Sequence, residues 1–316
     1  MGLLLDEANP QAALKAGKAG LARLPEGAAS DPELQYTIGS AELQAGEKAA
    51  GAKRLSTLLS AVDDLSLRNS IAYGLGDAGV ELPAAERAER QVLEQLGLQS
   101  EGWSLEGGPQ PLRVGTPLLV AAWDTLGWIL FREGKAAEAE PLVRAAWRNK
   151  LQGTIGEHLS EIEAARGQQA AARADLRLAI AAAKAAGEQS GAAQAALAGM
   201  ENRLQATEPG PAGKDVTAVE TAAALQRLRT FPLGAAAGRS GSTLFVLLIS
   251  RGKVVGQAAA PGQPASPGQA AAPGQGLSLA HADFSALFPA PGTFVQLVHL
   301  GTVNCAPRGC EVVLQP

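Results

Sequence analysis

The sequence of 316 residues predicts an α-helical solenoid of stacked helix pairs, an α-α superhelix, followed by a small α+β domain. Three observations lead to this prediction. Apolar residues recur with a helical period as far as residue 207, a set of residue types returns at a fixed offset of 33, and a strand period replaces the helical one from about residue 243. We therefore divide the chain into a helical domain (1–207), a linker (208–215) and an α+β domain (216–316).

The best-formed repeat covers 123–146. Trp123, Leu126 and Gly127 have the W-x-x-L-G spacing of a tetratricopeptide repeat, and Ala139 and Val143 have its later A-x-x-x-F spacing. Small residues at these places let two antiparallel helices approach, and a turn glycine supplies the irregular backbone that ends the first helix. A shift of 33 residues gives the matching positions Leu159, Gly167, Ala172, Leu176 and Ala179 for Leu126, Gly134, Ala139, Val143 and Ala146.

The composition limits the possible functions. Hydrophobic residues make up 46% of the chain but aromatic residues only 4%, so the core must come from many close helix contacts. A net charge of −4 gives no electrostatic footprint for nucleic acid. Two cysteines exclude a disulfide-dense scaffold and a four-cysteine zinc site.

The first residues, MGLLLDEANP, have no basic segment and no apolar stretch long enough for a signal peptide or a membrane span. A cytoplasmic location is the default expectation. However, 10–24 resembles the second helix of a repeat that lacks its first helix, and repeat arrays normally end in a polar cap. We therefore expect the natural protein to extend further at this end, and a longer chain would allow a cell-envelope or secreted location.

The helical domain is predicted element by element. Asp31 followed by Pro32 is an N-cap with proline at the first helical position. Pro141 lies inside one helix and predicts a slight kink there. The remaining pattern predicts helices at 31–45, 47–60, 64–80, 83–97, 116–132, 135–149, 154–167, 168–186 and 188–206.

Two features of this domain have competing interpretations. Gly74, Gly76 and Gly79 spell G-x-G-x-x-G, but a helical pattern leads into them where a dinucleotide site needs a strand, so we interpret them as a helix end. A long loop at 98–117 contains Trp103, which either contacts a ligand or packs onto the nearest helix; we favour packing.

The C-terminal domain begins with a helix at 216–229. Strands are then expected at 243–249 and 253–257 around the turn Ser250-Arg251-Gly252, and again at 294–304 and 311–314. Between these two pairs, a tract of repeated Ala, Pro, Gly and Gln at about 256–276 predicts a disordered insertion, and 277–288 predicts a short amphipathic helix capped by Ser278.

The pattern supports no catalytic residue, cofactor site or metal site. His158, His281 and His299 are scattered, and His158 with Glu161 is better explained as part of a repeat surface than as a metal pair. Cys305 and Cys310 could form a disulfide in an oxidising compartment, remain free thiols in a reducing one, or supply two ligands to a metal. The sequence leaves these three alternatives open.

For partner binding, the first helix of each pair is expected to line the concave face of the solenoid. Their outward positions could hold the backbone or charges of an extended peptide. The candidates are Arg68, Asn69, Asp124, Arg132, Glu157 and Glu161.

The segments LRNSIAY (67–73), WDTLGW (123–128) and LGTVNCAPRGCEVVLQP (300–316) resemble those of bacterial, acidobacterial-type tetratricopeptide-repeat proteins with a small β-rich C-terminal domain. Longer members of that group resemble secreted or envelope proteins with a transglutaminase-like region. The resemblance implies a non-enzymatic scaffold that binds a protein or peptide partner. From the charge and the apolar pattern we expect no nucleic-acid partner and no membrane span. The alternative is an accessory segment of a larger secreted transglutaminase- or peptidase-like enzyme.

Overall fold

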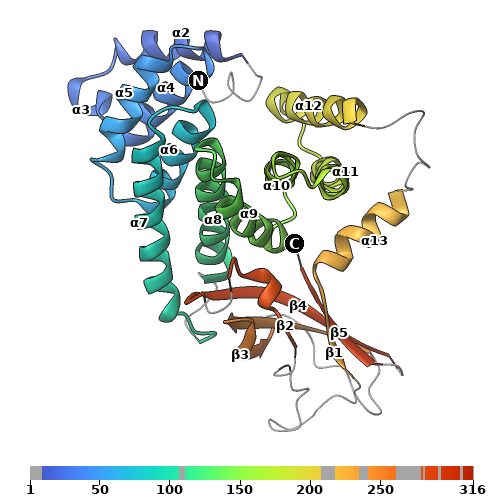
Figure 1. Ribbon diagram of the computed structural model, residues 1–316. Helices are drawn as coiled ribbons and strands as arrows, with labels where there is room; N and C mark the ends of the chain where they lie inside the picture. Colours follow the sequence, from blue (N-terminus) through green and yellow to red (C-terminus); the bar gives the residue numbers. More distant parts are fainter. Residues whose placement is uncertain are drawn as a thin grey trace.

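The computed structural model describes residues 9–106, 111–207, 218–234, 241–260, 279, 282–290, 293–306 and 309–315. Helices form the first and larger part of the molecule, and a small antiparallel sheet lies at the other end (Figure 1). The prediction of a helical part followed by a small α+β part is thus confirmed at this coarse level. The predicted linker at 208–215, the insertion beyond residue 260, Ser278 and His281 lie outside the described residues.

The helices follow the predicted order. Asp31 caps its helix as predicted, because its side chain accepts a hydrogen bond from Leu34 N at 2.9 Å. A single turn of π-helix at Pro111–Gly115 leads into α8. The bounds are α2 (Pro10–Leu21), α3 (Glu26–Ala29), α4 (Pro32–Gln44), α5 (Lys48–Leu59), α6 (Leu65–Ala78), α7 (Leu82–Glu101), α8 (Thr116–Arg132), α9 (Ala136–Asn149), α10 (Gly153–Ala165), α11 (Gln169–Ala186), α12 (Gly191–Thr207) and α13 (Ala218–Leu228).

The turns inside the helix pairs share one geometry. Gly134 ends α8 with φ 82° and Gly167 ends α10 with φ 78°, a left-handed conformation that glycine adopts without strain. The amide after each glycine bonds back to the helix, Lys135 N to Leu130 O at 2.8 Å and Gln168 N to Glu163 O at 2.9 Å, as in a Schellman motif. The same arrangement at Gly46 joins α4 to α5.

Small residues bring the paired helices together. A Cβ atom on Gly127 of α8 would lie 2.4 Å from Val143 Cγ2, and one on Gly39 of α4 would lie 2.5 Å from Leu55 Cδ2. The partner stands sixteen residues later in both pairs. Side chains at these two places would therefore force the helices apart. In the pair α10–α11, Ser160 occupies the matching place and donates to Ala172 O at 2.8 Å.

The sheet contains β1 (Thr230–Gly234), β2 (Gly241–Ser250), β3 (Lys253–Ala259), β4 (Gln296–Ala306) and β5 (Gly309–Leu314) in the order β1-β5-β4-β2-β3. All neighbours are antiparallel. The β2–β3 turn has positive φ at Arg251 and Gly252, the pattern of a type I′ hairpin.

Three local predictions are corrected. Residues 256–259 belong to β3, where Ala259 pairs with Phe245, and not to the insertion. The strand β1 was not predicted, because Pro232 interrupts its pattern; β1 is an edge strand, where proline is tolerated. In the described part of 277–288 no α-helix forms; Ser285–Leu287 is a 3₁₀ turn, and Phe284 N before it bonds to Gly252 O at 2.9 Å.

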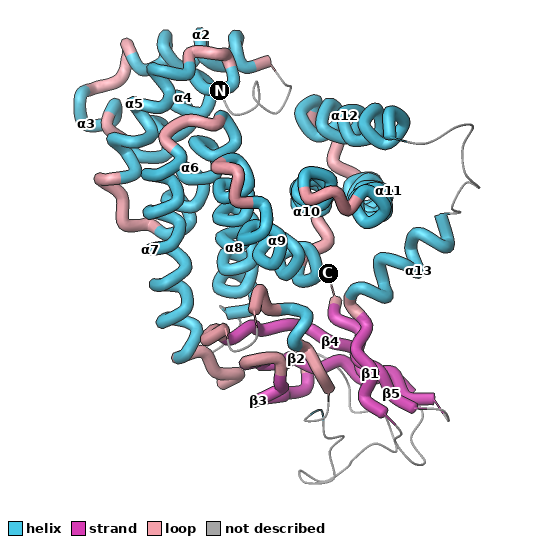
Figure 2. Tube along the Cα trace, in the orientation of Figure 1, coloured by secondary structure: helices cyan, strands magenta, loops and turns pink. Residues whose placement is uncertain are grey.

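Helices and sheet share one hydrophobic core. One face of the sheet carries Leu247, Ile249, Leu297 and Val312, which share a core with the buried residues of α7 to α10. The sheet lies below α7, α8 and α9 in Figure 2. Polar groups cross the same boundary. Ser100 and Thr116 accept from the amides of Gln296 and Val298, and Asn149 donates to Leu287 O at 2.7 Å.

One described helical stretch, Pro111–Arg132, is long and apolar enough to cross a membrane. Its most apolar window is 67% buried inside the fold, as in the core helix of a globular protein. Length and composition alone therefore give only weak evidence of a span.

Candidate partner-binding surfaces

The six residues predicted to bind a partner lie on α6, α8 and α10, the first helices of three successive pairs. Arg68 and Asn69 are half-buried, Arg132 is exposed, and Glu157 and Glu161 are half-buried. The prediction that all six point outward is wrong for one of them, since Asp124 is only 7% exposed.

Asp124 is buried because a histidine of the next helix pair packs against it. His158 Nδ1 lies 3.0 Å from Asp124 Oδ1, and His158 is 4% exposed, so it is not the surface residue that the sequence indicated. Burial by itself lowers the pKa of His158, but the charge of Asp124 and its hydrogen bond raise that pKa more, and the net direction is upward. The pair therefore holds α8 against α10.

An aromatic stack surrounds this pair. Trp128 lies parallel to the ring of His158, with 4.0 Å between the ring centroids, and Tyr73 of α6 lies 6.0 Å from the same histidine. The indole nitrogen of Trp128 donates to Asp77 Oδ1 at 3.3 Å. Burial, followed by the charge of Asp77, raises the pKa of Tyr73. The stack connects three helix pairs.

The outer charges of this face are paired within the molecule. Arg203 of α12 forms ion pairs with both Glu157 and Glu161. Burial raises the pKa of Glu157, and Arg203 opposes this shift. Arg132 donates to Asp77 O at 2.8 Å, and Arg68 donates to Gln91 at 2.7 Å. The bonds of Arg203 and Arg132 link neighbouring helix pairs, and that of Arg68 links the two helices of one pair. A partner would have to displace these bonds to use the same side chains.

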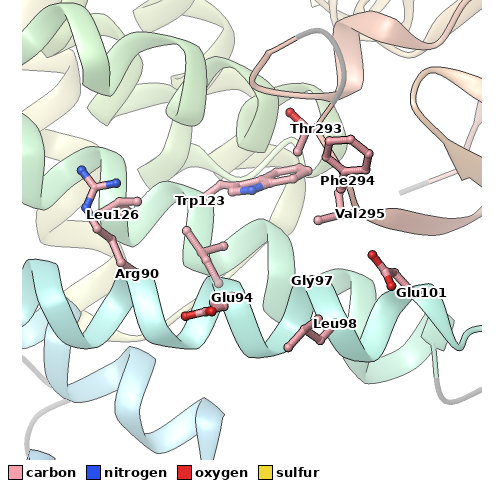
Figure 3. Close-up of a pocket in the computed structure, with 11 residues that line it drawn as sticks. Arg90, Glu94, Gly97, Leu98, Glu101, Trp123, Leu126, Thr293, Phe294 and Val295 are labelled. Atoms are coloured by element: carbon pink, nitrogen blue, oxygen red, sulfur yellow. The ribbon is translucent and has the colours of Figure 1, made fainter.

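A second surface was not found from the sequence. A groove of about 450 Å³ lies between α7, α8 and the segment before β4. Figure 3 shows Trp123 of α8 reaching toward Phe294 and Val295, with Leu98 and Glu101 of α7 along the near edge. Leu98 is 66% exposed and Phe294 is 65% exposed, although both are large apolar residues.

The charges of the groove are unequally paired. Arg90 at one end pairs with Glu86 at 2.7 Å. Glu94 and Glu101, by contrast, have no ion-pair or hydrogen-bond partner among the residues that the structure describes. They stand seven residues apart on α7, about 10 Å along the helix axis. The groove thus has apolar walls and two free carboxylates at its edge.

Sequence reasoning missed the groove because its two sides are far apart in the chain. The sequence pattern predicts a loop at Leu98, whereas α7 continues to Glu101. Trp103 packs as expected: a Cβ atom on Gly115 would lie 2.3 Å from Trp103 Cζ2.

Cys305 and Cys310 face each other on β4 and β5, and the structure joins them in a disulfide. No group of three or more potential metal ligands occurs in the described part of the chain. Gly79 ends α6 with φ 67°, so the G-x-G-x-x-G sequence is a helix end.

Comparison with protein-family models, curated proteins and solved structures finds no match to this chain. The resemblance to bacterial tetratricopeptide-repeat proteins and the residues assigned to partner binding remain predictions.

Proposed function

We propose that the protein is a non-enzymatic scaffold, built as a tetratricopeptide-like solenoid, that binds a protein partner in the groove between α7 and Phe294. The repeated turn geometry and the sixteen-residue spacing between Gly39 and Leu55 and between Gly127 and Val143 support the solenoid. The disulfide is of a kind that persists in oxidising compartments and supports a secreted or envelope location.

The exposed apolar pair Leu98 and Phe294 is the observation that carries the proposal. Such residues around a concave apolar floor are typical of interaction sites, where a few buried anchors provide most of the binding energy. The predicted concave face is less suited to binding a partner, because Arg203 already pairs with Glu157 there and Arg132 already donates to Asp77 O.

The charges define the partner. Glu94 and Glu101 are carboxylates two helical turns apart on one face of α7. An amphipathic helical peptide with apolar anchors and lysine or arginine residues seven positions apart would complement both the walls and the edge. We therefore propose such a basic amphipathic helix as the partner segment.

The test uses a fluorescein-labelled 18-residue peptide with leucine anchors and lysine residues at this spacing, and the same peptide with glutamate in place of lysine. Anisotropy should show at least tenfold tighter binding of the lysine peptide. The double variant Leu98→Ala, Phe294→Ala should weaken binding of the lysine peptide about tenfold. The double variant Glu94→Gln, Glu101→Gln should weaken it about threefold.

Val255→Ala is the matched control, since Val255 is 58% exposed and lies outside the groove. It should leave the affinity unchanged. Equal affinity of wild type and the Leu98→Ala, Phe294→Ala variant would overturn the proposal.

A further inference from the structure

A second cavity, of about 590 Å³, lies where α10, α11, α12 and α13 meet. Its walls are mostly aliphatic, with polar residues among them. They are formed by alanines of α11 and α12, such as Ala182 and Ala193, together with the larger residues Leu151, Leu197, Met200 and Leu225. A cavity of this size and lining is typical of small-molecule sites, which usually add a few polar groups that orient the ligand.

One of its lining residues is a buried arginine that has no counter-ion among the described residues. Arg229 is 4% exposed, and its Nε has no hydrogen-bond partner. Its Nη2 donates only to the backbone oxygen of Gln315, and no carboxylate pairs with it among the described residues. A guanidinium cannot lose its proton at neutral pH, so a positive charge is kept out of water here, and no carboxylate in the described part of the chain neutralises it.

The cavity also contains the uncapped start of a helix. Gln152, the N-cap residue of α10, and Gly153 and Thr154, its first two residues, line the cavity, and no side chain caps this 13-residue helix. The amides of a first turn lack partners within the helix, and the helix dipole makes this end partly positive. Arg229 and the start of α10 therefore provide two independent features that favour an anion.

The remaining charges at the cavity are few. Lys150 and Glu188 lie at its edge and both are exposed, so one adds to the positive charge and the other opposes it. His299 lies close enough to Arg229 for the arginine charge to lower its pKa further, after burial has lowered it. His299 is therefore neutral and adds no charge beside Arg229.

We propose that this cavity binds a small carboxylate with an aliphatic tail. The carboxylate accepts from the Arg229 guanidinium and from the free amides of α10, and the tail lies among the alanine and leucine side chains of α11 and α12. A charge-assisted bond to a buried guanidinium explains why Arg229 is kept there, and the lining explains the need for an apolar tail. The site is separate from the groove of α7, and its occupation does not depend on the proposed scaffold function.

Decanoate is the probe, measured by isothermal titration calorimetry with the full chain. Decanol has the tail without the charge, decylamine has the opposite charge, and acetate has the charge without the tail. Each should bind at least tenfold more weakly than decanoate. Equal binding of decanol, or no binding of decanoate at about 1 mM, would overturn the proposal.

Three variants locate the ligand. Arg229→Gln should weaken decanoate binding at least tenfold, and Arg229→Lys, which keeps the charge, should weaken it less. Ala193→Leu should also weaken it at least tenfold, because the larger side chain fills the cavity.

Ala195→Leu is the control on the same helix, because Ala195 is exposed and does not line the cavity. It should leave the affinity for decanoate within twofold of the wild type. If Arg229→Gln fails to fold by circular dichroism, the comparison of Ala193→Leu with Ala195→Leu decides. Equal affinities of these two variants would contradict the assigned site.

Discussion

Single small residues decide how closely the helices of this protein approach. Gly127 faces Val143 across the pair α8–α9, and the space next to its Cα is too small for a methyl group. Gly74 on α6 differs, because the nearest atom to its Cβ position, Leu55 Cδ1, is 3.8 Å away. Substituting alanine at each of the two glycines therefore separates the effect of packing from the effect of helix propensity.

Gly127→Ala should lower the free energy of unfolding by about 1–3 kcal/mol, because the overpacking outweighs the better propensity of alanine. Gly74→Ala should raise it by up to about 1 kcal/mol. Urea denaturation measures both. A stabilising Gly127→Ala would show that the two helices are not in close contact at this position.

The buried Asp124–His158 pair predicts a pH dependence. The pKa of His158 in the folded state lies above the unfolded value of about 6.5. The pair therefore contributes fully below that pH, and its contribution is lost as the pH rises through the folded-state pKa. Asp124→Asn should cost more stability at pH 6 than at pH 9, and NMR should show a lower His158 pKa in this variant.

Exposed Asp63→Asn is the control and should show no such trend. A His158 pKa that does not change in Asp124→Asn would contradict the assigned pair.

At the scale of elements, the helix pairs follow from the sequence and the sheet follows only in part. Apolar period and turn glycines locate α4 to α11 within a few residues. The edge strand β1 could not be predicted because it contains a proline, and the end of β3 could not be predicted because it consists of alanines. Neither residue type favours strands. The hairpin β4–β5 is closed by its disulfide.

Cys305→Ser with Cys310→Ser should lower the free energy of unfolding by roughly 2 kcal/mol, the effect of freeing a loop of six residues in the unfolded chain. Mass spectrometry after alkylation, with and without reductant, checks the bond itself. An unreduced protein that alkylates fully at both cysteines would rule it out.

At the scale of the whole molecule, the contacts on which the proposed function depends join segments far apart in the chain. Asp124 stands at an outward position of its own helix and is covered by α10, which local patterns cannot predict. The groove combines Leu98 and Phe294, and the chain between them contains the helices α8 to α13 and the strands β1 to β3. Asn149 and His299 connect α9 to β4 at 2.8 Å.

His299 makes this connection sensitive to acid. Burial, followed by the charge of Arg229, lowers its pKa to about 3. The folded-state value lies below the unfolded one, so stability is complete above about pH 6.5 and falls as the pH decreases toward 3. Between pH 6.5 and 5 the loss should be about 2 kcal/mol. His299→Gln should flatten this part of the pH profile, and an unchanged profile would contradict the assignment.

The central claim is that a partner helix binds at the groove and not on the concave face. The most direct measurement is a ¹H–¹⁵N NMR titration of the protein with the lysine-containing amphipathic peptide. We predict that the largest shifts fall on 93–101 of α7 and on 293–295. Shifts concentrated instead at Tyr73, Asp124 and Glu161 would place the partner on the concave face and contradict this account.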